Sequence, residues 1–160
     1  MADITLTQSA GFGLATILPR PGHGAEAIAA ALADAGTVLL PTGPAQWLAM
    51  AASGGPGWAG ALAMRLAGIA HVVDQSSAYA LFVLAGGEAP ALLQKGLPID
   101  MADAAFPVGH VAVSVIAHIG VICQRAAPDR FHLLCFRSYA ASFSHWLEET
   151  RGALATGNHP

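Results

Sequence analysis

Alternation of side chains marks the stretch from residue 110 to residue 119. One set of alternate positions is wholly aliphatic, while the other set includes two histidines and a serine; the aliphatic set is Val111, Val113, Val115, Ala117 and Ile119. A period of two is typical of a β-strand with two unlike faces. Because Gly120 interrupts the run, we predict two strands that separate near this glycine, the second covering residues 121–125.

A spacing of three and four between apolar residues predicts helices elsewhere in the chain. The predicted helices cover residues 23–35 and 58–67, a short segment after Gly86-Gly87 that contains Pro90, and a last segment from Ser138 to about residue 152. Pro90 suits the first turn of a helix, where a missing N–H group is harmless. Ser138 is the predicted N-cap of the last helix.

Short apolar runs that end at turn-forming residues predict the remaining strands. They cover residues 37–40, 46–51, 69–73, 78–85, 98–101 and 131–136. Residues 78–85 are nearly all apolar, as expected of a strand that is buried on both faces. Helices and strands alternate irregularly, with hairpins among the strands. The predicted class is therefore α+β, with mixed or antiparallel sheets and packed helices in two loosely similar halves.

The chain length of 160 residues predicts a single domain over residues 1–160. Within it, residues 1–20 are expected to form an irregular or strand-containing lead, and residues 153–160 a frayed tail. No basic segment followed by an apolar core of signal length occurs at the N-terminus, so the expected location is the cytoplasm. Cys123 and Cys135 both lie in apolar stretches, which predicts buried, reduced thiols.

Charged residues are scarce and make up 11% of the chain, against roughly 25% in a typical soluble domain. Burial of part of the surface against a partner protein explains this composition, and a genome rich in alanine and glycine codons explains it equally well. The net charge of −3 argues against nucleic-acid binding. No charged residue lies between Asp103 and Arg125, but the alternating pattern there favours strands over a membrane span.

Motifs for chemistry are weak throughout. The sequence contains no phosphate-binding GxxxxGK[ST] loop, no GxSxG nucleophile motif and no HExxH metal motif. His110 and His118 would lie about 26 Å apart on one extended strand, too far to share an ion, so no metal site is predicted even with His132 nearby. Asp74 is the best single candidate for a functional polar residue, although aspartate at a strand end also serves to close turns.

Two segments resemble a known family. Residues 74–96 contain Asp74-x-Ser76, an apolar strand and the pattern G-x-x-A-x-x-L-L-x-K-G, which is similar to aminomethyltransferase-like, folate-binding domains. Residues 95–109 add K-G-x-P-x-D followed by A-F-P-x-G, which resembles the gamma subunits of heterotetrameric sarcosine oxidases. The likeness covers about residues 37–150 and implies the aminomethyltransferase-like folate-binding fold.

The resemblance also implies a function. Such a chain would be an accessory, non-catalytic subunit that contacts alpha, beta and delta subunits, mainly the large alpha subunit, and neither nucleic acid nor membrane. The other subunits would oxidise the N-methyl group of sarcosine, giving glycine and a one-carbon unit for tetrahydrofolate. FAD, FMN, NAD, tetrahydrofolate and zinc would be bound there. No catalytic residue carries over to this chain, and Asp74 and Asp100 are the candidate folate-type residues.

Two alternatives remain open at this point. The chain could act alone as a folate-binding or aminomethyl-transfer protein, in which case Asp74 and Asp100 would be the residues to test. It could also be the corresponding subunit of a related N-methyl amino-acid dehydrogenase, which differs only in its substrate.

Overall fold

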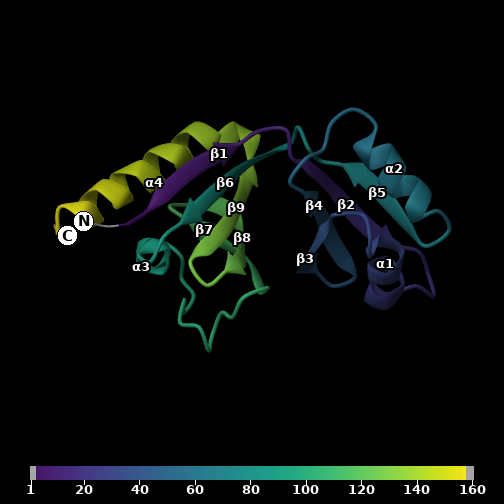
Figure 1. The fold of residues 1–160 in the computed structure, drawn as a ribbon, viewed down its shortest axis with the longest axis horizontal. Helices are drawn as coiled ribbons and strands as arrows, with labels where there is room; N and C mark the ends of the chain where they lie inside the picture. Colours follow the sequence, from purple (N-terminus) through teal and green to yellow (C-terminus); the bar gives the residue numbers. More distant parts are fainter. Residues whose placement is uncertain (1–2, 158–160) are drawn as a thin grey trace. The chain divides into compact units, whose positions relative to one another are not determined.

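The computed structural model describes residues 3–157, which form two compact units. One unit contains residues 3–9 and 79–157, and the other contains residues 10–78. Each unit is an antiparallel sheet with helices, so the predicted α+β class in two similar halves is confirmed (Figure 1). The prediction of a single domain over residues 1–160 stays a prediction.

The larger unit, which we call the terminal unit, is built on a five-stranded sheet. The strand order is β1-β6-β9-β8-β7, and each neighbouring pair is antiparallel. The elements are β1 (Thr5–Ser9), β6 (Tyr79–Ala85), α3 (Ala89–Gln94), β7 (Val111–Ile116), β8 (Ile119–Ala127), β9 (Arg130–Phe136), the 3₁₀ turn η1 (Arg137–Tyr139) and α4 (Ala140–Ala155).

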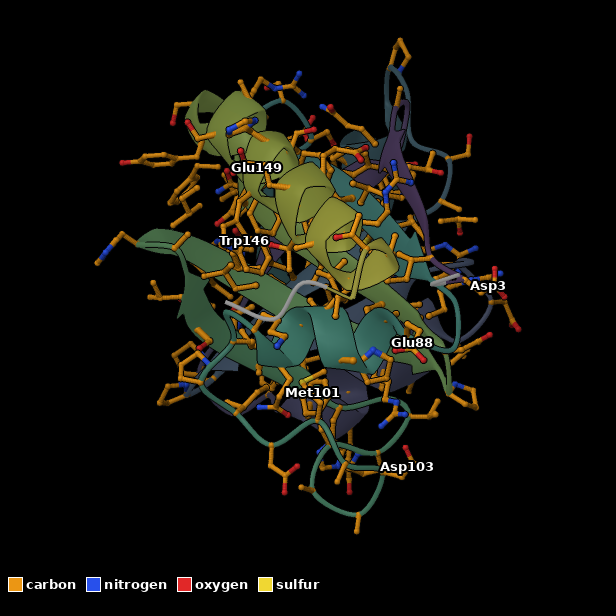
Figure 2. All side chains as sticks on the ribbon, turned by 90° about the vertical axis from the view of Figure 1, so that its left-hand side faces the viewer. Asp3, Glu88, Met101, Asp103, Trp146 and Glu149 are labelled. Carbon is orange, nitrogen blue, oxygen red and sulfur yellow. The ribbon has the colours of Figure 1, made fainter. Side chains whose placement is uncertain are left out.

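Both helices of the terminal unit pack on the same face of its sheet. Figure 2 shows α3 and α4 in front of the strands. Leu92 and Leu93 of α3 and Phe143 of α4 are fully buried in one core with the strand side chains that point to this face. Phe82 of β6 meets Phe143 edge-on, with ring centroids 5.3 Å apart. The apolar run of β6 places Ala80, Phe82 and Leu84 in this core, and Leu81 between them is also buried.

The smaller unit, which we call the middle unit, has a four-stranded antiparallel sheet in the order β3-β4-β2-β5. Apolar residues of both helices pack with alternate residues of the strands in a second core, and Ile17, Ile28 and Leu66 are fully buried there. The elements are β2 (Gly13–Pro19), α1 (Ala25–Leu32), β3 (Val38–Gly43), β4 (Gln46–Ala51), α2 (Trp58–Arg65) and β5 (Ala70–Asp74).

Several boundaries differ from the predictions. In the lead over residues 1–20 the strand-containing alternative holds, because the described part contains β1 and β2. Residues 98–101 form no strand and belong to the loop between α3 and β7. The predicted tail is helical as far as Ala155, and residues 158–160 lie outside the described residues.

Two predicted ends of elements in the terminal unit also differ from the structure. The β7–β8 hairpin turns at Ala117 and His118, both with positive φ, while Gly120 lies within β8. Ser138 lies in the 3₁₀ turn rather than at the start of α4, whose N-cap residue is Tyr139. No helix within residues 3–157 is long and apolar enough to cross a membrane.

Candidate functional site

Asp74 lies at the end of β5 and shapes the turn that follows. Its Oδ1 accepts a hydrogen bond from the backbone N–H of Ser76 at 2.9 Å. This backbone bond, together with one from the Ser76 side chain, lowers the pKa of the Asp74 carboxyl. The Ser76 hydroxyl bridges both backbone groups of Leu14, at 3.0 Å from the N atom and 3.3 Å from the O atom. Asp74 thus shapes the turn, and Ser76 fastens it to β2.

Asp100 makes the same bond in the other unit. Its Oδ1 accepts a hydrogen bond from the backbone N–H of Ala102 at 2.9 Å. In both places an aspartate accepts from the N–H two residues further on, which is the geometry of an Asx turn. Each of the two candidate carboxylates therefore serves a local turn in its own unit.

The loop between α3 and β7, residues 95–110, carries the second of the family-like motifs. Its first part is held by Gln94, the last residue of α3. The Gln94 amide donates to the carbonyl of Ile99 at 2.8 Å and accepts from the N–H of Met101 at 3.1 Å. One side chain thus satisfies two backbone groups of the loop, as a strand partner would.

The second part of the loop is held by Arg125 of β8, which is only 3% exposed. Its five N–H groups donate to Met101 O (3.4 Å), Phe106 O (2.9 Å), Pro128 O (twice, 2.7 and 3.3 Å) and Asp103 Oδ1 (2.5 Å). Figure 2 shows Met101 beside α3 and Asp103 farther out on the loop. Four of the five bonds reach carbonyl oxygens, so Arg125 acts mainly as a clamp on the backbone.

A surface cavity of about 240 Å³ lies beside this clamp, lined by Asp103, Pro107, Val108, Arg125 and Pro128. The guanidinium group has all five of its N–H donors engaged, so it offers no donor to a ligand while Asp103 stays in place. The Arg125 group also lies over the Phe131 ring, 5.4 Å from the centroid. We interpret the cavity as the solvent side of the Arg125 clamp, with a structural role rather than a ligand-binding one.

Gly96 of the K-G pair is explained by its neighbour on α4. A Cβ atom at this position would lie 2.5 Å from the indole ring of Trp146 and 3.0 Å from Cγ2 of Ile116. Trp146 is in turn stacked parallel to Phe143, with centroids 6.4 Å apart. The glycine is therefore required by the close approach of α4 to the end of α3.

Among residues 3–157, the histidines and cysteines do not assemble a reactive group. His132 Nδ1 lies 3.0 Å from Gln124 Oε1, and burial, followed by the charge of Arg130, lowers its pKa. Cys123 and Cys135 are free and buried, and burial raises their pKa values to about 12 and about 11. Within residues 3–157, no three His, Cys, Asp or Glu side chains come together in a way that could hold a metal ion.

Comparison with known proteins decides the family. The sequence profile of the family described as "Sarcosine oxidase, gamma subunit family" matches residues 22–153. The chain belongs to the sarcosine oxidase gamma subunit family. A relative from Arthrobacter sp., named "Sarcosine oxidase subunit gamma", is 31% identical over 122 residues, which cover 76% of this chain and 60% of the relative. The chain therefore spans less than two thirds of the length of that relative.

Solved structures share the fold. A chain of the heterotetrameric sarcosine oxidase from Corynebacterium sp. U-96, solved with pyrrole 2-carboxylate, superimposes with a TM-score of 0.82 at 24% identity, covering 98% of this chain and 86% of that chain. Aminomethyltransferase T of the glycine cleavage system from Bartonella henselae gives a TM-score of 0.66 at 13% identity, covering 91% of this chain and 45% of that chain. The predicted aminomethyltransferase-like fold is confirmed.

Sequence reasoning missed the residues that give the family motifs their physical role. Gln94, Arg125 and Trp146 hold the motif residues in place, yet none of them was selected as a candidate. One signal was present for Arg125, because it is the first charged residue after a long uncharged stretch and lies in a buried strand. A charge in such a place needs local partners, which points to a buried polar network.

Proposed function

We propose that this chain is the accessory, non-catalytic gamma subunit of a sarcosine oxidase-like complex. The observation that carries the proposal is the family match over residues 22–153. The contacts of the polar residues support it, because these residues bind groups of this chain itself: Asp74 and Asp100 close turns, and Arg125 binds loop carbonyls.

In this proposal the chemistry takes place in the other subunits. They demethylate sarcosine oxidatively to glycine and pass the one-carbon unit to tetrahydrofolate, using bound FAD, FMN, NAD and zinc. The residues described in this chain do not fit a metal ion, because they bring no three ligand side chains together. The gamma chain contributes a folded surface for the alpha, beta and delta subunits, mainly for the large alpha subunit.

The low charge content supports a partner-bound role. With 11% charged residues, the chain has few groups to hold a hydrated surface, and several large apolar side chains stay exposed. Burial of such side chains against a partner removes about 25 cal/mol of unfavourable free energy for each Å² of apolar surface.

Co-expression tests this proposal directly. The affinity-tagged chain is expressed with the three neighbouring oxidase subunits from the same genome, and the purified material is analysed by light scattering and sarcosine turnover. We expect one complex that contains all four chains and oxidises sarcosine. A tagged chain that elutes alone beside well-folded partners contradicts the accessory role. A complex of all four chains that oxidises other N-methyl amino acids but not sarcosine keeps the accessory role and contradicts sarcosine as the substrate.

A second candidate function is folate binding by the chain itself, which the fold shared with aminomethyltransferase T favours. It predicts heat of binding when tetrahydrofolate is titrated into the isolated chain. Asp74→Asn and Asp100→Asn are suitable variants, because asparagine keeps the acceptor of the Asx turn but removes the charge. Binding that weakens in either variant supports a folate role for that residue, and absence of heat in the unsubstituted chain refutes this candidate.

A further inference from the structure

The two sheets of the described chain end in four edge strands, and three of them are protected. An open strand edge attracts other strands, and proteins usually protect it with proline, bulges, charges or polar residues. The edge strand β3 contains Pro41 and an irregularity between Pro41 and Gly43. The edge strand β5 has exposed His71 and ends at Asp74, and β1 is short and largely polar.

Strand β7 has little of this protection, since Ser114 is its single polar residue. Its sequence, Val-Ala-Val-Ser-Val-Ile, contains no charge and no proline, and its pairing with β8 runs from Val111 to Ile116 without a register shift. In the described part of the chain, β8 is the only strand that pairs with β7. The alternation of antiparallel pairing leaves every second residue of β7 with its N–H and C=O directed to the open edge.

The side chains of β7 extend this edge into an apolar surface. Val113 is 60% exposed and Val115 is 49% exposed, whereas Ile116 is fully buried toward the helices. Val115 pairs with Gly120 on β8, which has no side chain, and one strand further on Phe136 is 53% exposed. The register places Val115, Gly120 and Phe136 in one row on the face away from α3 and α4.

The charge pattern restricts what can cover this surface. No Asp, Glu, Lys or Arg occurs between Asp103 and Arg125, so the β7–β8 hairpin carries no such charge from Val111 to Gln124, and its one arginine, Arg125, is buried. A charged segment laid on it would lose hydration without gaining an opposite charge. An extended, uncharged segment with apolar side chains at alternate positions matches both the open backbone groups and the exposed valines, as in recognition by strand addition.

We propose that β7 is the docking edge for the large partner subunit, which adds an extended apolar strand beside it and covers Val113, Val115 and Phe136. This inference rests on the proposed accessory function and specifies the surface that performs it. It assigns the exposed valines to a contact between subunits rather than to the core of this chain.

The test measures binding of the full-length chain to the large subunit from the same genome. The variant Val113→Lys/Val115→Lys places two charges on the edge, and Val38→Lys is the matched control, because Val38 is a 45% exposed valine on the protected edge strand β3. We expect binding about 100-fold weaker for the double variant, the effect of burying an unpaired charge. The control should bind within about twofold of the unsubstituted chain, since exposed substitutions have small effects.

Hydrogen exchange provides a second measurement that needs no substitution. Amides of residues 111–116 in the unsubstituted chain should exchange at least tenfold more slowly in the complex than in the free chain, because strand addition occupies the outward N–H groups. Circular dichroism and thermal melting confirm that each variant is folded.

The outcomes separate the inference from the proposed function. If the unsubstituted chain binds the large subunit but the double variant binds equally well, or if the amides of residues 111–116 gain no protection, β7 is not the docking edge. If the unsubstituted chain does not bind the large subunit at all, the accessory function itself is wrong. If the free chain is instead a dimer that the double variant disrupts, a second copy occupies the edge and the proposed partner is wrong.

Discussion

Replacement of Arg125 by methionine tests the clamp on the loop of residues 95–110. Methionine keeps most of the aliphatic length that packs against Phe131, but it removes all five N–H donors. The carbonyl oxygens of Met101 and Phe106 belong to buried residues, and both lose the guanidinium as a partner.

The size of the effect follows from these orphaned acceptors. A buried polar group without a partner costs about 1–3 kcal/mol, so two carbonyls cost roughly 2–6 kcal/mol before the loop relaxes. The third carbonyl, that of Pro128, lies in an exposed turn where water can replace the arginine. We therefore expect a loss of about 3 kcal/mol in the free energy of unfolding, which corresponds to a melting temperature roughly 6–12 °C lower.

Urea unfolding followed by tryptophan fluorescence measures the loss, and hydrogen exchange locates it. Amides of residues 98–109 should exchange faster in Arg125→Met, while those of α1 in the middle unit serve as an internal reference and should keep their rates. Arg125→Lys should resemble the methionine variant more than the unsubstituted chain, because one ammonium group cannot reach all four acceptor groups.

Asp103→Asn is the matched control that separates the carbonyl bonds from the ion pair. The Asp103 side chain is 89% exposed, and an exposed charge partner contributes about 0–1 kcal/mol. Asparagine also keeps an oxygen that can accept from the guanidinium. A loss below about 1 kcal/mol in Arg125→Met, or an equal loss in Asp103→Asn, would refute the view that the clamp acts through the backbone carbonyls.

Three further outcomes are expected. Gly96→Ala should destabilise the chain by about 1–3 kcal/mol in urea unfolding because its new methyl group meets the indole of α4, whereas Gly60→Ala, in open space on α2, should be neutral or stabilising. The Asp74 carboxyl should show a pKa below the ordinary value of an aspartate in an NMR titration; since its folded pKa is lowered, its contribution to stability is present above the unfolded pKa and is lost as the pH falls through the folded value. Cys123 and Cys135 should react with a thiol reagent at pH 8 only after unfolding, and rapid reaction of the folded chain would contradict their burial.

The elements that were predictable from sequence are those whose signal is local. The alternation after His110 predicted strand pairing because every second side chain of β7 and β8 faces one core. The apolar run of residues 78–85 predicted a strand, which the structure has as β6 (Tyr79–Ala85). Strand β1 was not predictable in the same way, because it is short and polar and its partner β6 lies more than 70 residues further along the chain.

Other predictions failed because one residue type serves several purposes. Gly120 was predicted to mark the end of the first strand, but Ala117 and His118 take the positive φ values at the turn, which residues other than glycine seldom adopt, although histidine does so more often than most. Asp74 and Asp100 were selected for their charge, whereas their carboxylates accept from nearby backbone N–H groups. Composition identifies a carboxylate but does not determine whether it closes a turn or meets a ligand.

The clamp and the proposed docking edge belong to one hairpin, which couples them physically. Gly109 donates its N–H to Arg125 O at 2.8 Å, and Arg125 donates its own N–H to His110 O at 3.0 Å, so the pairing of β7 with β8 begins at the clamp. If Arg125→Met loosens the loop, the first residues of β7 fray, and the affinity for the large subunit is reduced in proportion to the fraction of molecules in which β7 remains ordered. Such a variant should lose affinity without touching the partner and should regain it at lower temperature, where fraying is reduced. The Val113→Lys/Val115→Lys variant changes the contact with the partner itself, so the loss of affinity in this variant should persist on cooling.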